Sequence, residues 1–219
     1  MSAYARTRVK ICGLTRPEDV AAAVRSGADA IGLVFYEQSS RALTIAQAQS
    51  LRSAVPAFVD VVALFVNANP DYVRQVIEHV QPDLLQFHGD ESPEYCQSFK
   101  RRYFRGFRVG APGLDTAAGV LQSCRAYMSA SAWLVDSYSP HYGGSGVKLN
   151  VDLLAAVRAA LDSRPLILAG GLTPESVADS MAAVHPYAVD VSSGVETAPG
   201  IKSDVKIKAF IRAVNAAGF

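Results

Sequence analysis

The sequence predicts an α/β protein, a single (β/α)8 barrel (TIM barrel) over residues 1–219, and three observations support this prediction. A short apolar run, a polar or glycine turn and an amphipathic stretch recur in that order eight times along the chain. Helix-capping residues follow several strand ends, as parallel βα units require. Eight units of roughly 27 residues fit the compact end of the size range of this barrel. The alternative is an open doubly wound sheet, which more often carries GxGxxG after its first strand, where this chain has CGLT.

The predicted strands are short and rich in β-branched apolar residues, which is typical of parallel strands buried on both faces. They lie at residues 9–12, 30–35, 59–66, 84–87, 104–109, 132–135, 166–169 and 188–191. The amphipathic stretches predict helices at residues 17–26, 45–55, 71–80, 92 to about 102, 116–125, 151–161 and 204–216, and one that begins at Thr173. We expect Asp60, near the start of the third strand, to lie at the end of the barrel away from any active site.

Four of the turns contain Thr, Asn or Ser with proline one or two places later, namely Thr15, Asn69, Ser92 and Thr173. The side-chain oxygen of such a residue can accept a hydrogen bond from the first free N–H groups of a helix, and proline suits the first helical position. Thr15 also forms the capping-box pattern with Glu18. We therefore expect these residues to cap the helices that follow them.

The composition indicates one compact domain in a reducing cytosol. Half of the residues are hydrophobic, the formal net charge is +1 with interspersed signs, and no linker or low-complexity tract divides the chain. No segment reads as a signal peptide or a membrane span. The cysteines (Cys12, Cys96 and Cys124) are odd in number and widely spaced, which argues against a disulfide framework or a structural zinc site. We expect a cytoplasmic protein that binds neither nucleic acid nor membrane, with Cys96 and Cys124 packed in helices.

The seventh and eighth units carry turns suited to an anion. Gly170 and Gly171 follow the seventh strand directly, so that open backbone N–H groups and a helix N-terminus face whatever lies above them. Taken alone, this segment is equally compatible with a tight turn that binds nothing. Ser192, Ser193 and Gly194 follow the eighth strand, and barrels often bind phosphate over these two strands. The two turns together predict a phosphate site.

Other polar residues at the strand ends indicate proton transfer. Cys12 ends the first strand and Asp136 follows the sixth. The histidines and carboxylates lack metal-ligand spacing, so no metal is expected, and no nucleophile-elbow sequence supports a Ser–His–Asp triad. One thiol and one carboxylate on different strands of a phosphate-binding barrel can remove one proton and supply another.

Seven segments carry a family resemblance and cover nearly the whole chain. They are VKICGLT (9–15), DAIGLVF (29–35), LLQFHGDE (84–91), LVDS (134–137), GGSG (143–146), LAGGLTPE (168–175) and DVSSGVE (190–196). In these segments and their order, the sequence resembles the phosphoribosylanthranilate isomerase family. The KICG and DVSSGVE segments are the specific ones.

The resemblance implies an enzyme of tryptophan biosynthesis. Its substrate would be N-(5'-phosphoribosyl)anthranilate, converted by Amadori rearrangement to 1-(2-carboxyphenylamino)-1-deoxy-D-ribulose 5-phosphate. The match makes Asp136 the general acid and Cys12 the general base. The opened substrate carries its own electron sink, so no cofactor is expected. A thiol base calls for a lowered pKa, to which the nearby helix start could contribute, and Asp136 must hold a proton near neutral pH.

The resemblance also implies the substrate contacts. Arg41 matches the position that contacts the anthranilate carboxylate, although Ser40 replaces the proline that the family often has before it. Asp190 would bind ribose hydroxyls, and His88 would anchor the loop after the fourth strand or contact the substrate. Gly144, in the GGSG segment, would bind phosphate as part of a flap.

Two alternatives differ from this interpretation. Another phosphosugar barrel, an epimerase or a synthase, would need strand histidines or strand-end lysines, and neither Lys10 nor Lys148 is placed at a strand end. A non-catalytic phosphosugar sensor would need neither Cys12 nor Asp136. The sequence is compatible with a monomer or a homodimer.

Overall fold

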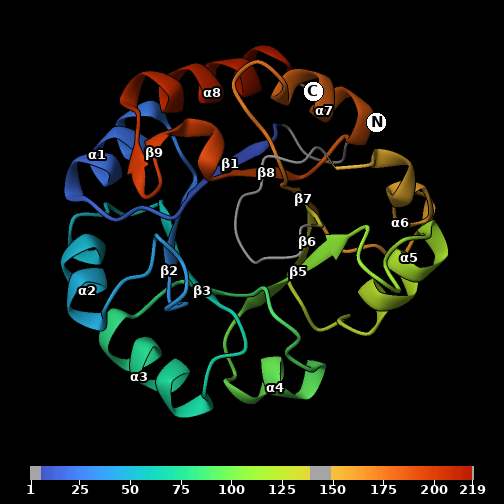
Figure 1. Ribbon diagram of the computed structural model, residues 1–219, viewed down its shortest axis with the longest axis horizontal. Helices are drawn as coiled ribbons and strands as arrows, with labels where there is room; N and C mark the ends of the chain where they lie inside the picture. Colours follow the sequence, from blue (N-terminus) through green and yellow to red (C-terminus); the bar gives the residue numbers. More distant parts are fainter. Residues whose placement is uncertain (1–5, 139–148, 219) are drawn as a thin grey trace.

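The structure is a computed structural model that describes residues 6–138 and 149–218. Eight parallel strands form a closed barrel in the order β1 to β8, and helices surround it (Figure 1). The strands are β1 (Arg8–Cys12), β2 (Ala30–Val34), β3 (Asp60–Phe65), β4 (Leu84–Phe87), β5 (Tyr103–Val109), β6 (Ala132–Ser137), β7 (Leu166–Leu168) and β8 (Ala188–Val191). The predicted barrel is confirmed, because β1 pairs with both β2 and β8 and leaves no open sheet edge.

The helices cover the outer face of the barrel. They are α1 (Pro17–Ser26), α2 (Ile45–Ser53), α3 (Pro70–Val80), α4 (Pro93–Ser98), α5 (Ala117–Arg125), α6 (Ala155–Ala159), α7 (Val177–Val184) and α8 (Asp204–Ala216). The 3-10 helix η1 (Val151–Leu154) precedes α6, so the sixth predicted helix is divided in two. The fourth is shorter than predicted, since Lys100 adopts a left-handed backbone (φ 52°) that an α-helix cannot continue. In the described ranges, no helix combines the length and apolar character needed to cross a membrane.

The helix starts correct part of the capping prediction. Asn69 and Ser92 cap α3 and α4 as expected, accepting bonds from the N–H groups of Asp71 and Tyr95. Thr15 does not cap α1: its hydroxyl donates to the carbonyl of Gly200 at 2.6 Å, and the N-cap residue is Arg16.

Thr173 does not begin α7 either. Its N–H donates to the Ser176 hydroxyl, and residues 174–176 form a turn before the helix begins at Val177. Thr15 thus bonds to a residue distant in the sequence, and Thr173 bonds to a later residue of its own turn. Neither threonine makes the predicted cap.

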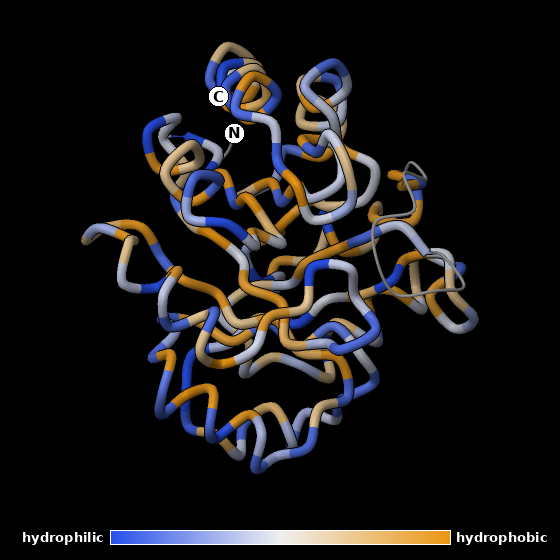
Figure 2. The backbone as a smooth tube through the Cα atoms, turned by 60° about the vertical axis from the view of Figure 1, so that its left-hand side comes forward, coloured by the Kyte–Doolittle hydropathy of each residue, from blue (hydrophilic) through white to orange (hydrophobic). Residues whose placement is uncertain are grey.

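Two layers of apolar side chains hold the barrel together. A large core fills the space between strands and helices, and a smaller cluster includes Val62, Leu134, Ile167 and Ala188. Figure 2 shows hydrophobic residues concentrated along the strands at the centre. Because side chains alternate along a strand, Asp190 shares the inner face of β8 with Ala188 and lies one layer nearer the carboxyl end. The apolar cluster therefore forms the base on which the polar layer rests.

A small antiparallel hairpin that the sequence pattern does not reveal follows β8. The 3-10 helix η2 (Ser193–Val195) leads into β9 (Glu196–Ala198), which pairs with β10 (Ile201–Lys202). Two- and three-residue strands are too short for a detectable alternation of apolar and polar residues. The other expectations on packing are confirmed: Asp60 begins β3, and Cys96 and Cys124 are fully buried in α4 and α5.

Candidate active site

A pocket at the carboxyl ends of the strands brings together the candidate residues that the structure describes. Those that line it are Cys12, Arg41, His88, Asp136, Gly170, Gly171, Asp190, Ser192, Ser193 and Gly194. Gly144 and the rest of the GGSG segment lie outside the described residues. The lining also includes residues that the sequence did not single out, among them Tyr36, Gln86, Arg108 and Ser137. Within the described ranges, no group of three or more His, Cys, Asp or Glu side chains could hold a metal ion.

Cys12 stands at the end of β1 above a buried ion pair. Its side chain reaches the pocket although the residue is only 6% exposed. Lys10 lies two residues earlier on the same strand, and its Nζ donates to both carboxylate oxygens of Asp190 at 2.9 Å. Lys10 lies inside the strand and not at its end, but the alternation of side chains puts it on the same face of β1 as Cys12. The Asp190 carboxylate is thus held by Lys10 as well as facing the pocket.

The expected lowering of the Cys12 pKa is wrong. Burial raises the pKa of the Cys12 thiol above its ordinary value, and the Lys10 ammonium acts against that rise. A buried thiol has lost the water that would stabilise its anion, so a nearby positive charge has to replace that water. That charge comes chiefly from Lys10, on the strand itself.

Asp136 and His88 face each other across the carboxyl ends of β6 and β4. His88 Nε2 lies 3.4 Å from Asp136 Oδ2, and Gln86 Nε2 lies 3.1 Å from His88 Nδ1. With the amide nitrogen of Gln86 donating, Nδ1 accepts and the imidazole carries its proton on Nε2, facing the carboxylate. The backbone N–H of His88 donates to the carbonyl of Phe65 at 2.9 Å, which joins the start of this loop to β3.

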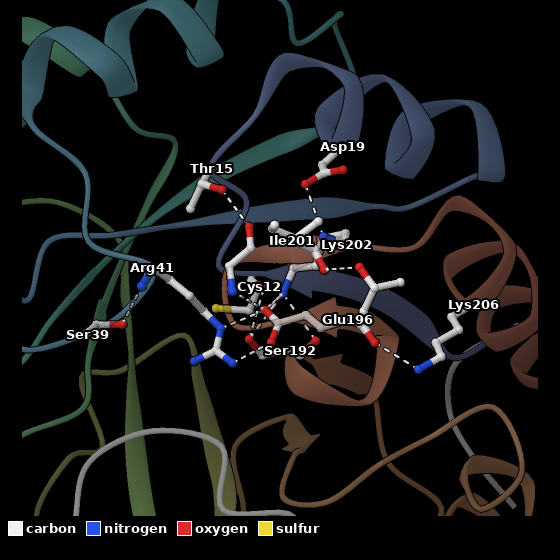
Figure 3. Close-up of polar contacts among 12 residues, drawn as sticks. Cys12, Thr15, Asp19, Ser39, Arg41, Ser192, Glu196, Ile201, Lys202 and Lys206 are labelled. Carbon is white, nitrogen blue, oxygen red and sulfur yellow. Dashed lines mark hydrogen bonds and ion pairs between the residues drawn. The ribbon is translucent and has the colours of Figure 1, made fainter.

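Arg41 is held by a residue that the sequence analysis missed. Its Nε and Nη2 donate to the two oxygens of Glu196 at 2.7 and 2.6 Å, and Lys202 Nζ donates to the same carboxylate at 2.7 Å (Figure 3). Burial acts to raise the pKa of Glu196, but the two cations outweigh it and the pKa lies below the ordinary value. Glu196 lies in the DVSSGVE segment, and this motif could have indicated that the residue belongs to the site. No motif of the sequence pointed to Lys202, which lies on β10.

The two predicted phosphate turns are packed against each other. Gly170 and Gly171 both have positive φ angles (87° and 64°), which glycine adopts without strain. Gly194 lies so close to the carbonyl of Leu172 that an added Cβ would overlap it. The Ser192 hydroxyl donates to the carbonyl of Cys12 at 3.1 Å and so joins this turn to the end of β1.

Each of four candidate side chains rests against a glycine of a neighbouring segment. An ideal Cβ on these glycines would meet the side chain within 3 Å. The pairs are Cys12 with Gly32, Arg41 with Gly13, His88 with Gly106, and Asp136 with Gly170. The missing Cβ atoms therefore create the space in which the polar groups gather.

Comparison with known proteins agrees with this geometry. The family model described as N-(5'-phosphoribosyl)anthranilate (PRA) isomerase matches residues 9–213. The chain is 60% identical over 209 residues to N-(5'-phosphoribosyl)anthranilate isomerase of Bordetella parapertussis, with 95% of this chain and 96% of the relative covered. It is 51% identical over 208 residues to the protein of the same name from Pseudomonas fluorescens, with 94% and 98% covered.

Solved structures give the same result. Phosphoribosyl anthranilate isomerase of Thermotoga maritima matches with a TM-score of 0.86 at 37% identity, covering 96% of this chain and 99% of that chain. A phosphoribosyl anthranilate isomerase in complex with reduced 1-(o-carboxyphenylamino)-1-deoxyribulose 5-phosphate matches with a TM-score of 0.82 at 34% identity, covering 96% and 99%. The chain belongs to the N-(5'-phosphoribosyl)anthranilate isomerase family.

Proposed function

We propose that Cys12 and Asp136 carry the two proton transfers of the Amadori rearrangement that this family of tryptophan-biosynthesis enzymes catalyses. The observation that supports the proposal is that a thiol and a carboxyl group from different strands line one pocket together with the paired glycine and serine turns. The substrate would be N-(5'-phosphoribosyl)anthranilate, and the product 1-(2-carboxyphenylamino)-1-deoxy-D-ribulose 5-phosphate.

In the first step Asp136 acts as the general acid. It donates a proton to the furanose ring oxygen, the bond from that oxygen to C1 breaks, and the lone pair of the anthranilate nitrogen forms a C1=N double bond. The resulting cation acidifies the proton on C2, because the electrons left behind can move into the C=N group. His88, with Nε2 3.4 Å from Asp136 Oδ2, orients the carboxyl group for this donation.

In the second step Cys12 acts as the general base. The thiolate removes the C2 proton, and the electron pair of that bond forms a C1=C2 double bond to give an enolamine. The enolamine tautomerises, with C1 gaining a proton and the C2 hydroxyl losing one, and the ketone product results. Both steps use groups of the protein and the substrate, and the substrate nitrogen is the electron sink.

The remaining pocket residues fit the two ends of the substrate. Gly170, Gly171, Ser192, Ser193 and Gly194 offer N–H groups and hydroxyls to the phosphate, and the family resemblance adds Gly144. Arg41 would bind the anthranilate carboxylate through the part of its guanidinium that Glu196 does not use, and Asp190 would bind ribose hydroxyls.

The experiment that tests this function follows the anthranilate fluorescence of the substrate. Purified protein should remove that fluorescence in a catalytic manner. Stoichiometric binding without turnover would instead indicate a phosphosugar sensor, and no effect would indicate a different phosphosugar substrate. One member of the family, from Thermotoga maritima, is described as dimeric, and light scattering would distinguish the monomer from the homodimer for this chain.

A further inference from the structure

We propose that Lys10 is a positioning residue whose ammonium group, held beneath the thiol by Asp190, provides the positive charge that allows Cys12 to exist as a thiolate in a buried pocket. The proposal rests on the base role proposed above for Cys12. The substrate contacts and the two proton transfers proposed above give no role to the buried ammonium group of Lys10.

The geometry places Lys10 directly below the thiol. Lys10 is 4% exposed and Asp190 8% exposed, and their charged groups are joined by two hydrogen bonds of 2.9 Å. The sulfur of Cys12 and the Nζ of Lys10 lie 2.7 and 3.1 Å from one point, the ideal Cβ position on Gly32. The distance between the sulfur and the Nζ is therefore at most the sum of these two distances. Gly32, paired with Cys12 on the neighbouring strand, leaves room for both groups.

A purely structural role does not explain this ion pair. Burying two charges costs solvation free energy that their attraction rarely exceeds, and apolar side chains of similar volume are often as stable or more so. The layer below includes such side chains, Leu134 and Ile167 among them, so an apolar pair could continue this packing. A charged pair at this position is explained if the positive charge of Lys10 is needed to stabilise the thiolate form of Cys12.

Several charged or titratable groups lie near Cys12, from different elements. The groups that interact with Cys12 are Lys10 on β1, Asp190 on β8, Lys202 on β10 and Arg41 after β2. Further along the wall of the same pocket are Tyr36, His88, Arg108 and Asp136. Arg41 and Lys202 share the Glu196 carboxylate, which offsets much of their charge. Against the burial that raises the pKa of Cys12, Lys10 is the strongest opposing influence, ahead of Lys202.

Lys10 itself stays protonated. Burial lowers the pKa of its ammonium group, but Asp190 and then Cys12 outweigh burial, and the pKa lies above the ordinary value. The cation is therefore present throughout the pH range in which a thiol would ionise. Asp190 has two effects: it holds Lys10 in place, and its own charge opposes thiolate formation. The net support for the thiolate should come from the ammonium group.

The test measures thiolate formation without relying on turnover. The full chain is treated with iodoacetamide over a series of pH values, and mass spectrometry quantifies alkylation of the peptide that contains Cys12. Since the thiolate is the reacting form, the rate follows its ionisation. Lys10→Met should move the midpoint upward by about one unit or more, which is about tenfold slower alkylation at a pH below both midpoints. The acidic limb of kcat/KM should move in the same direction.

A matched control and a double variant keep the test decisive. Lys206→Met removes another lysine near β9, one that donates to the carbonyl of Glu196, and should leave the alkylation profile of Cys12 unchanged. If Lys10→Met fails to fold because Asp190 is left unpaired, Lys10→Met/Asp190→Asn is compared with Asp190→Asn, and the double variant should react more slowly.

Coincident profiles for Lys10→Met and the wild type, or for the double variant and Asp190→Asn, would overturn the proposal. If the protein lacked isomerase activity while Lys10→Met still shifted the profile, the role of Lys10 toward the thiolate would stand and the function proposed for Cys12 would fall.

Discussion

The Arg41 guanidinium and the Glu196 carboxylate meet edge to edge, with hydrogen bonds of 2.7 and 2.6 Å from Nε and Nη2. Both side chains are nearly buried, with exposed fractions of 12% and 6%. This pairing fixes the plane of the guanidinium and uses one of its edges. A substrate carboxylate would meet a cation that is already oriented, so little side-chain entropy would be lost on binding.

Glu196→Gln should therefore weaken substrate binding more than catalysis. We expect KM to rise roughly tenfold, equivalent to about 1.4 kcal/mol, with kcat nearly unchanged, because the guanidinium loses its orientation but keeps its charge. Steady-state kinetics measure both constants. Asp162→Asn is the control, since it alters the exposed pair of Arg125 and Asp162 and should change neither constant. A fall in kcat at constant KM would contradict the assignment of Arg41 to substrate binding.

Glu196 should also make stability depend on pH. Its pKa is lower in the folded protein than the ordinary value, because Arg41 and Lys202 outweigh burial. Its stabilising effect is therefore fully present above the unfolded pKa and is lost as pH falls through the folded pKa. The difference in the free energy of unfolding between wild type and Glu196→Gln should shrink below about pH 4. Urea titrations at several pH values measure it, and a difference independent of pH would count against the ion pair.

Cys12→Ala and Asp136→Asn should each reduce kcat by several orders of magnitude. The affinity for a product analogue, reduced 1-(o-carboxyphenylamino)-1-deoxyribulose 5-phosphate, should stay largely intact. Alanine cannot remove the C2 proton, and an amide cannot deliver the proton that opens the ring. Fluorescence-detected turnover and calorimetric binding report the two effects separately. Cys96→Ala is the control for the thiol, since Cys96 is buried in α4 and its substitution should lower stability but spare kcat. A near-normal rate for Cys12→Ala would exclude thiol base catalysis.

Gly106→Ala should lower kcat, roughly tenfold, by displacing His88. The three atoms nearest to a Cβ at this position all belong to the imidazole ring of His88. The ring would have to shift, and its contact with Asp136 would change. KM should change little, because the phosphate turns are untouched. Gly218→Ala, just after the end of α8, makes the same chemical change outside the pocket and should leave kcat unchanged. An unaltered kcat for Gly106→Ala would show that the His88–Asp136 contact does not orient the acid.

Much of the fold could be predicted because its signals are local. Leu84–Phe87 and Ala188–Val191 were predicted with their observed bounds, since a short apolar run between turns defines a buried strand. Asn69 and Ser92 cap their helices through residues two or three places away. Thr15 matched the same pattern, but its hydroxyl bonds to Gly200 instead. A capping pattern cannot show whether a partner from elsewhere will compete for the side chain.

The eight strand–helix units, the glycine and serine turns, and the presence of Cys12 and Asp136 at strand ends could be read from the residues in order. The pairing of the charges could not, because it depends on the folded arrangement of the chain. Lys10 bonds to Asp190 across 180 positions of the chain and Arg41 to Glu196 across 155, through closure of the barrel and a hairpin too short to leave a pattern. The physical reason is that an ion pair depends on the distance between two atoms and on their burial, and both are set by the closed ring of strands rather than by neighbouring residues.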